Sequence, residues 1–126
     1  MPREPLVAII DDDESIRQTT EDLLESAGFS AASFASADSF LRHKWLNRFC
    51  CMIADMRMPG MSGIELHQRL TASSRAIPTI LISAYMDDRV RAQALQTGIV
   101  CCLAKPFAPE ELLGCVRAAL TRTLKS

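Results

Sequence analysis

Short apolar runs alternate with longer amphipathic segments along the chain. Five runs have the length and composition of strands, at residues 6–11, 30–34, 50–54, 79–83 and 100–104. Three of them are almost continuously apolar, which is typical of strands covered on both faces, whereas the run at 30–34 is more polar and suits an edge strand. Strands that alternate with helical patterns predict βα units and a parallel sheet.

Five helices fit between and after these runs, and they are also marked by end signals. Their predicted boundaries lie at Gly28, Ser36, Ser62-Gly63, Asp87, Gly98 and Pro109. Their apolar positions share one face of each helix: Ile16, Leu23, Leu24, Ala27, Phe40, Leu41, Ile64, Leu66, Leu70, Val90, Ala94, Leu95, Leu112, Leu113, Val116, Ala119 and Leu120. His43 and His67 are expected on solvent-facing helix surfaces. Without any repeat or linker, residues 1–126 are predicted to form one (βα)5 domain.

The succession of five βα units restricts the topology of the sheet. Right-handed crossovers with helices on both faces fit a flavodoxin-like, doubly wound parallel sheet with strand order 2-1-3-4-5. In that order the first and third strands are neighbours at the point where the order reverses. Binding sites of open α/β sheets lie at this point, outside the carboxyl ends of the strands.

Composition and charge narrow the functional classes. The 126 residues are 48% hydrophobic and 23% charged with a net charge of -1, so nothing indicates a surface for nucleic acid or anionic membranes. No apolar stretch approaches the roughly 20 residues of a membrane-spanning helix. Five cysteines, an odd count, lie mostly in apolar runs and indicate buried thiols in a reducing compartment. We therefore expect a cytoplasmic protein without a secretory signal.

Polar side chains mark the carboxyl ends of four predicted strands. Asp11 and Asp12 follow the apolar run 6–10 of the first strand, Asp55 follows the third strand, Ser83 ends the fourth, and Lys105 follows the fifth. The predicted strand order brings these ends together at one edge of the sheet. Crowded carboxylates repel one another unless a cation joins them. Oxygen ligands without a suitable His or Cys nearby favour Mg²⁺ or Mn²⁺, so the sequence predicts a divalent-metal site.

The same residues can handle a phosphoryl group. A carboxylate can attack phosphorus and form an acyl phosphate, while a metal ion and a cation such as Lys105 neutralise the transferring group. Ser83 is placed to donate to a phosphoryl oxygen. Asp55 stands alone at its strand end and is the best candidate nucleophile, whereas Asp11 and Asp12 are better placed as metal ligands.

The chain closely resembles the receiver (CheY-like) domain of bacterial two-component response regulators. The resemblance lies in four segments in the family's order and spacing: IIDDDESIR, ADMRMPGMSGIEL, PTILISAY and AKPFAPEEL. It covers essentially the full length, and the segment SFASADSFL looks like the FixJ/NarL type. The resemblance implies a signalling phosphoprotein that catalyses only its own phosphorylation and dephosphorylation, and that is not an enzyme acting on a free metabolite.

The resemblance also implies how the phosphoryl group is received. Asp55 would accept it from a phosphohistidine of a sensor histidine kinase. Ser83 matches the switch hydroxyl that moves toward the phosphoryl group, and Lys105 matches the lysine that pairs with it. The Lys105–Pro106 peptide bond is expected to be cis.

Metal ligands and modulating positions follow from the same resemblance. Asp12 would bind Mg²⁺ directly and Asp11 through water, with Asp55 and the backbone carbonyl of Arg57 completing the protein's share of the coordination. Arg57 and Tyr85 occupy positions that tune hydrolysis of the acyl phosphate in the family.

One residue departs from the family pattern. Where the family usually has Phe or Tyr, three residues before the lysine, this chain has Cys102. A small thiol cannot swing a ring between buried and exposed positions. Coupling between phosphorylation and the surface of the fourth helix and fifth strand is therefore expected to be weaker or differently built.

Other classes of protein fit these residues less well. An aspartate-nucleophile phosphatase needs a second acid two residues after the nucleophile, where this chain has Arg57. A flavin carrier needs a Ser/Thr/Gly-rich phosphate loop, whereas the acids at 11–14 repel phosphate. A pseudo-receiver that acts by protein contact without phosphorylation remains open because of Cys102.

The partners that the resemblance implies are few. A sensor kinase is expected, together with a homodimer formed on phosphorylation. DNA is a partner only if a separate output domain follows in a longer protein, and no membrane partner is expected. The sequence names neither the signal nor the regulated genes.

Overall fold

The computed structural model describes residues 6–43 and 48–125, in which strands and helices alternate. The strands are β1 (Leu6–Ile10), β2 (Ser30–Phe34), β3 (Phe49–Asp55), β4 (Thr79–Ser83) and β5 (Cys101–Ala104). The helices are α1 (Glu14–Ser26), α2 (Ala37–Leu41), α3 (Gly63–Ala72), α4 (Asp88–Gln96) and α5 (Pro109–Lys125). Each predicted strand and helix is present, in the predicted order.

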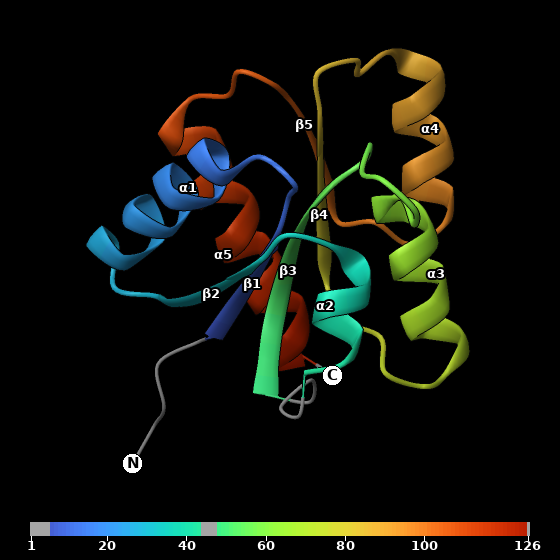
Figure 1. Ribbon diagram of the computed structural model, residues 1–126, viewed down its shortest axis with the longest axis horizontal. Coiled ribbons are helices and arrows are strands. Elements are labelled where there is room, and N and C mark those ends of the chain that lie inside the picture. The colour runs from blue at the N-terminus through green and yellow to red at the C-terminus, as the bar shows by residue number, and fades with distance from the viewer. Residues whose placement is uncertain (1–5, 44–47, 126) are drawn as a thin grey trace.

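The strands form one parallel sheet with the order β2-β1-β3-β4-β5. This confirms the predicted flavodoxin-like, doubly wound α/β fold. β1 and β3 are adjacent, and Ile10 pairs with Ala54 near their ends. The residues that follow therefore leave the sheet side by side, at its upper edge in Figure 1.

Helices cover both faces of the sheet (Figure 1). On one face, α1 and α5 contribute Leu24 and Val116 to a core that includes the buried side chains of β1, β3 and β4. On the other face, α2, α3 and α4 contribute Phe40, Leu66 and Ala94. Burial on both faces explains why the central strands read as continuous apolar runs.

Three strands differ slightly from their predicted bounds, and β1 ends at Ile10, one residue before its predicted end. β3 begins at Phe49, whose ring is buried, and it includes Asp55 as its last residue. β5 begins at Cys101, while the N–H of Val100 already donates to the carbonyl of Thr79. Asp55 is therefore held by the sheet itself rather than by a following loop.

Side-chain caps begin four of the helices. The side chains of Ser36 and Asp87 accept hydrogen bonds from backbone N–H groups three residues further on, which confirms these predicted caps. A capping box begins α3: the Ser62 hydroxyl accepts from the N–H of Glu65, and the Glu65 carboxylate accepts from the N–H of Ser62. Asp13 caps α1, so this acid begins a helix and is accounted for outside the acidic site.

The other ends of α1 and α4 also follow the prediction. Gly28 and Gly98 come just after these helices with φ of 94° and 97°, values that favour glycine. The placement of Leu95 on the buried face of α4 is wrong, because its side chain is 49% exposed. The nine residues of α4 bury Ala94 fully but turn Leu95 outward.

The expectation of solvent-facing histidines is wrong. His67 in α3 is only 5% exposed, and its Nδ1 lies 3.0 Å from Thr79 Oγ1. Its Nε2 lies 2.9 Å from the carbonyl oxygen of Thr97, to which it must donate. His43 follows α2 and is half-buried, with its ring 5.3 Å from that of Phe34. Helical periodicity gave no sign of these partners, because they come from other elements.

The five cysteines are thiols that form no disulfide with one another. Cys51 and Cys102 are buried and the others half-buried. Burial raises the pKa of Cys51 to about 12. Burial, together with a smaller effect of the hydrogen bond with Cys101, raises the pKa of Cys115 to about 12. Both thiols stay protonated at neutral pH and behave as the small apolar residues that the sequence predicted.

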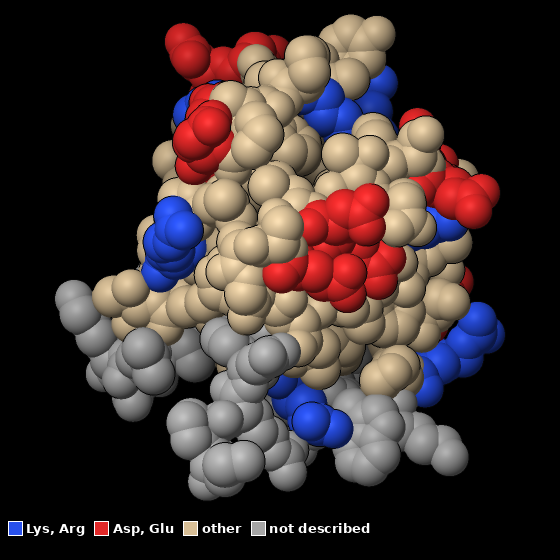
Figure 2. All heavy atoms as spheres, turned by 90° about the vertical axis from the view of Figure 1, so that its left-hand side faces the viewer, with Lys and Arg blue, Asp and Glu red and all other residues tan. Residues whose placement is uncertain are grey.

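The surface carries charges of both signs. Acidic side chains gather in the middle of the face that lies at the left of Figure 1 (Figure 2). α1 lies on that side, and its second half contains Glu21, Asp22 and Glu25. Such a face repels the phosphates of nucleic acids. In the described part of the chain, no helix combines the length and apolar character needed to cross a membrane.

Candidate functional site

Three carboxylates meet at the carboxyl ends of β1 and β3. One ligand atom from each of Asp11, Asp12 and Asp55 can be chosen so that all lie within 4.8 Å of one another. Asp11 and Asp55 are buried, while Asp12 is exposed. The adjacency of β1 and β3 brings these acids together, as the strand order predicted. The opening of the site toward solvent at Asp12 provides a path for an ion.

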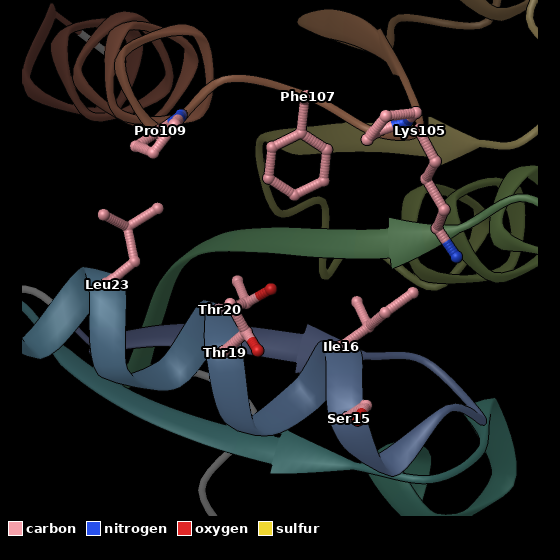
Figure 3. A pocket seen from close by; sticks show the side chains of 9 residues that line it. Ser15, Ile16, Thr19, Thr20, Leu23, Lys105, Phe107 and Pro109 are labelled. Atoms are coloured by element: carbon pink, nitrogen blue, oxygen red, sulfur yellow. The ribbon is translucent and has the colours of Figure 1, made fainter.

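Lys105 joins two of these acids. Its Nζ donates to Oδ2 of Asp55 at 2.9 Å and to Oδ2 of Asp11 at 3.1 Å. Figure 3 shows its side chain extending from the loop between β5 and α5 toward the end of β3. The Lys105–Pro106 bond is cis, as expected. The lysine therefore supplies the positive charge that the sequence placed here.

The charges of the site shift each other's protonation. Burial raises the pKa of Asp11, although the Asp13 N–H and the Lys105 ammonium partly oppose this. Burial lowers the pKa of Lys105, but its hydrogen bonds and ion pairs with Asp55 and Asp11 outweigh that effect and raise it overall. Lys105 is therefore charged at neutral pH, and a buried Asp11 carboxylate gains from any further cation.

Three strand-end side chains are oriented in the same way. Oδ1 of Asp11 accepts a hydrogen bond from the N–H of residue 13 at 2.9 Å, and Oδ1 of Asp55 from that of residue 57 at 3.2 Å. The hydroxyl of Ser83 accepts one from the N–H of residue 85 at 3.1 Å. At each of these strand ends, the side chain thus accepts a hydrogen bond from the backbone two residues further on and forms a short turn. These turns hold the polar atoms at the site and leave the second carboxylate oxygens free for Lys105.

Ser83 lies next to the lysine at the ends of β4 and β5. It is 1% exposed, and its carbonyl accepts a hydrogen bond from the N–H of Lys105 at 2.8 Å. On the neighbouring strand, Asp55 pairs with Ile82, one residue before Ser83. The structure therefore brings Ser83 to the same edge as the acids.

The donor set suits a hard divalent cation. Its side chains offer carboxylate oxygens, with no His or Cys in the group, and this chemistry fits Mg²⁺ or Mn²⁺ better than zinc. One acid is solvent-exposed, which leaves room for the water ligands that magnesium keeps. The residues present thus fit the predicted metal.

Arg57 and Tyr85 lie together beside the site. The guanidinium carbon of Arg57 is 4.8 Å from the centroid of the Tyr85 ring, in a cation–π contact. The ring is 67% exposed. Both residues follow an oriented strand-end side chain by two positions, so their backbones are part of the turns at Asp55 and Ser83.

A cavity of about 410 Å³ opens beside the lysine (Figure 3). It lies between α1 and the loop that leads into α5. Its lining is Ser15, Ile16, Thr19, Thr20, Leu23, Lys105, Pro106, Phe107 and Pro109. The cavity is largely apolar and the Lys105 ammonium points out of it toward the acids, so it adjoins the polar site without containing it.

Cys102 is buried on the face covered by α3 and α4. Its side chain is 5% exposed and packs with Ile64, Leu81 and Ala94. Arg91 of α4 donates to the backbone carbonyl of Cys102 at 2.8 Å. Burial raises the pKa of the Cys102 thiol, although the charge of Arg91 opposes this. The position where the resemblance predicts an aromatic ring thus holds a small buried residue whose backbone carbonyl is bonded by Arg91.

Sequence reasoning missed one residue near the acids. Nη1 of Arg17, in the first turns of α1, donates to the backbone carbonyl of Asp11 at 2.8 Å. The spacing of six residues across the cap at Asp13 is the only sequence signal, and it becomes readable once that cap is known.

The fold and the site define a flavodoxin-like α/β domain with an acidic cluster beside a lysine. Comparison with known families is specific: the family described as the response regulator receiver domain matches residues 7–117. The chain belongs to this family, and it is a receiver domain of the two-component response regulator type.

Similar proteins support this assignment. The response regulator protein TodT of Pseudomonas putida is 38% identical over 118 residues, which cover 94% of this chain and 52% of TodT. The transcriptional regulatory protein FixJ of Bradyrhizobium diazoefficiens is 34% identical over 114 residues, covering 90% of this chain and 56% of FixJ. The chain thus spans about half the length of these relatives.

Solved structures show the same fold. The structure of the response regulator StyR superposes with a TM-score of 0.89 at 40% identity, covering 98% of this chain and 62% of that one. The structure of FixJ-N superposes with a TM-score of 0.83 at 29% identity, covering 95% and 96% of the two chains. The resemblance to FixJ-type regulators thus extends from sequence to structure.

Proposed function

We propose that this domain accepts a phosphoryl group on Asp55 from a phosphohistidine of a sensor histidine kinase, in a magnesium-dependent reaction. The observation that carries the proposal is the double ion pair of Lys105 with Asp55 and Asp11, inside a group of three carboxylates. A lysine held on the nucleophile itself is placed where the negative charge of a phosphoryl group arrives.

The transfer needs only groups that meet at this edge. A carboxylate oxygen of Asp55 attacks phosphorus, the P–O bond forms as the P–N bond breaks, and the histidine nitrogen keeps the electron pair and takes up a proton. Lys105 neutralises one phosphoryl oxygen. The Ser83 hydroxyl donates to another and, once drawn toward it, changes the end of β4.

Four groups would hold the metal ion. These are the carboxylates of Asp11, Asp12 and Asp55 and the backbone carbonyl of Arg57, with Asp11 acting through water. Bound Mg²⁺ would supply further neutralisation of the transferring oxygens. The raised pKa of the buried Asp11 carboxyl supports this role, because a second cation favours its charged form.

The consequence of phosphorylation is a changed protein-binding surface, not turnover of a free metabolite. Slow hydrolysis of the acyl phosphate ends the signal, and we assign its control to Arg57 and Tyr85, whose contact stands at the edge of the site. We expect the protein in the cytoplasm with a sensor kinase as its partner. We also expect a homodimer on phosphorylation, and DNA binding only through a separate output domain.

A pseudo-receiver is the second candidate function. The buried Cys102 favours it, because the family usually has an aromatic ring at this position. Such a protein would bind partners equally well with or without phosphate. The acids and Lys105 favour the phosphorylated mechanism.

The test is treatment with acetyl phosphate and Mg²⁺, followed by intact-mass measurement. Wild type should gain the mass of one PO₃ group, and Asp55→Asn should gain none. Asp38→Asn, an exposed acid of α2, is the matched control and should behave as wild type. An adduct that survives Asp55→Asn would reject the assignment of the nucleophile. Absence of any adduct in wild type, from both acetyl phosphate and a phosphorylated kinase, would favour the pseudo-receiver.

A further inference from the structure

Arg17 binds the backbone of the acidic loop instead of pairing with its carboxylates. Its Nη1 donates a 2.8 Å hydrogen bond to the carbonyl oxygen of Asp11, and its side chain is half-buried. Among the described residues, the salt bridges at the site come from Lys105 alone. Two cations therefore serve the acids differently, one through their carboxylates and the other through the main chain.

The bonds around Asp12 show what Arg17 fixes. The N–H of Asp11 donates to the carbonyl of Phe34, which ends the pairing of β1. Beyond it, Arg17 holds the carbonyl of the peptide that joins Asp11 to Asp12. The next peptide is held by its own N–H, that of Asp13, which donates to Oδ1 of Asp11. Both peptides that flank Asp12 are thus fixed in orientation.

Asp12 needs such fixing more than its neighbours do. Asp11 and Asp55 are buried and bonded to Lys105, whereas Asp12 is exposed to solvent. Repulsion from the other two carboxylates drives an exposed side chain outward into water. Two pinned peptides keep its Cα, and with it the carboxylate, at the rim of the cluster.

The helix start places Arg17 within reach. Asp13 caps α1, and the N–H of Arg17 donates to the carbonyl of Asp13 at 3.0 Å, one turn further on. The chain from Asp11 to Arg17 thus closes into a ring of main-chain and side-chain bonds. We propose that Arg17 is a positioning residue that holds the peptide between Asp11 and Asp12 for divalent-cation binding. This inference rests on the magnesium-dependent function proposed above.

The charge of Arg17 makes the proposal sharply testable. A guanidinium close to the acids repels Mg²⁺, so its removal should tighten metal binding if charge were its only effect. Loss of a positioning contact should weaken metal binding instead, as for other outer partners of metal ligands. The two roles predict changes of opposite sign.

The experiment is calorimetric titration with Mg²⁺ alone, together with thermal unfolding in EDTA. Arg17→Met removes the charge and the hydrogen bond, and Arg17→Lys keeps the charge on a shorter side chain that cannot place its donor where Nη1 lies. Arg117→Met, an exposed arginine of α5, removes the same charge elsewhere. We expect Kd for Mg²⁺ to rise about tenfold in Arg17→Met and several-fold in Arg17→Lys. Arg117→Met should stay within about twofold of wild type, on the scale of a screened surface charge.

Each outcome decides a different point. Unchanged or tighter Mg²⁺ binding by Arg17→Met would overturn the positioning role, while the proposed function would stand. Should Arg17→Met fail to fold, Arg17→Lys decides alone, and wild-type affinity there would equally overturn it. If wild type takes up no Mg²⁺ at all, the proposed function falls first and the role of Arg17 with it.

Discussion

Asp11 is a buried acid whose surroundings pull its protonation in opposite directions. It is 0% exposed, it accepts hydrogen bonds on both carboxylate oxygens, and burial still leaves its pKa raised above the ordinary value. A raised pKa means that the folded protein holds this proton more tightly than the unfolded chain does. The ionised carboxylate therefore costs stability at neutral pH, and the cost disappears as the pH falls through both pKa values.

Replacement of this acid should exchange metal binding for stability. Asp11→Asn keeps an oxygen that accepts from Lys105 but removes the buried charge. Without metal, its melting temperature at pH 7 should exceed that of wild type. The difference should vanish near pH 3, where Asp11 is protonated in both states of wild type. Mg²⁺ affinity should fall. Circular dichroism melts in EDTA and a magnesium titration check both points. A lower melting temperature at pH 7 would show that the lost ion pair outweighs the relief of burial.

At the scale of elements, α3 is packed against Asp55, the proposed nucleophile. A Cβ built on Gly63, the first residue of α3, would lie 2.6 Å from the carbonyl oxygen of Asp55 and 2.7 Å from Leu81 Cδ1. Its N–H donates to the carbonyl of Met56. No side chain fits here unless the helix moves, so this glycine sets the distance between α3 and β3.

Gly63→Ala should therefore disturb both stability and chemistry. The backbone of Asp55 cannot yield as a flexible side chain would, and we expect a loss of about 1–3 kcal/mol in the free energy of unfolding, with slower formation of the phosphate adduct. Gly114→Ala in α5 is the matched control, because a Cβ there meets nothing within 4 Å. It should gain about 0.5–1 kcal/mol as a helical alanine. Urea unfolding and intact mass measure both effects, and wild-type behaviour of Gly63→Ala would contradict the packing argument.

The sequence predicted the fold better than it predicted the burial of single residues. Buried central strands leave long apolar runs, and β2 and β4 lie at the predicted bounds. The polar strand ends placed Asp55, Ser83 and Lys105 at one edge because parallel strands share it. Periodicity could not predict that His67 is buried, since its partners lie 12 and 30 residues away. The bond of Arg17 to Asp11 stayed hidden for a related reason, because it depends on the conformation of the turn between them.

At the scale of the whole molecule, we expect the surface formed by α4 and β5 to connect the site to partners. Arg91 fastens α4 to the carbonyl of Cys102 on β5, and Tyr85 and Leu95 are the large apolar side chains most exposed in the described part of the chain. Because residue 102 is a cysteine, it has no aromatic ring that could couple the end of β4 to this surface. We expect phosphorylation to move it only weakly.

Cys102→Tyr should strengthen association that depends on phosphorylation. The tyrosine ring is too large for the small buried space of the thiol. We therefore expect it to swing between a buried and an exposed position on this surface. An aromatic contact of about 1 kcal/mol would tighten the dimer roughly fivefold. Sedimentation velocity with and without acetyl phosphate and Mg²⁺ measures this, and Cys102→Ala is the control without a ring. If association is unchanged while the adduct still forms, the absence of a ring at position 102 is not what weakens the coupling.

The reach of Lys105 along the chain has a consequence for synthesis. Its two partners stand 94 and 50 residues earlier. A nascent polypeptide whose Lys105 has not yet emerged from the ribosome contains both acids but lacks the positive charge that pairs with them. We therefore expect phosphoryl acceptance only after nearly all of the domain has been made, and we expect a fragment that ends before Lys105 not to be phosphorylated.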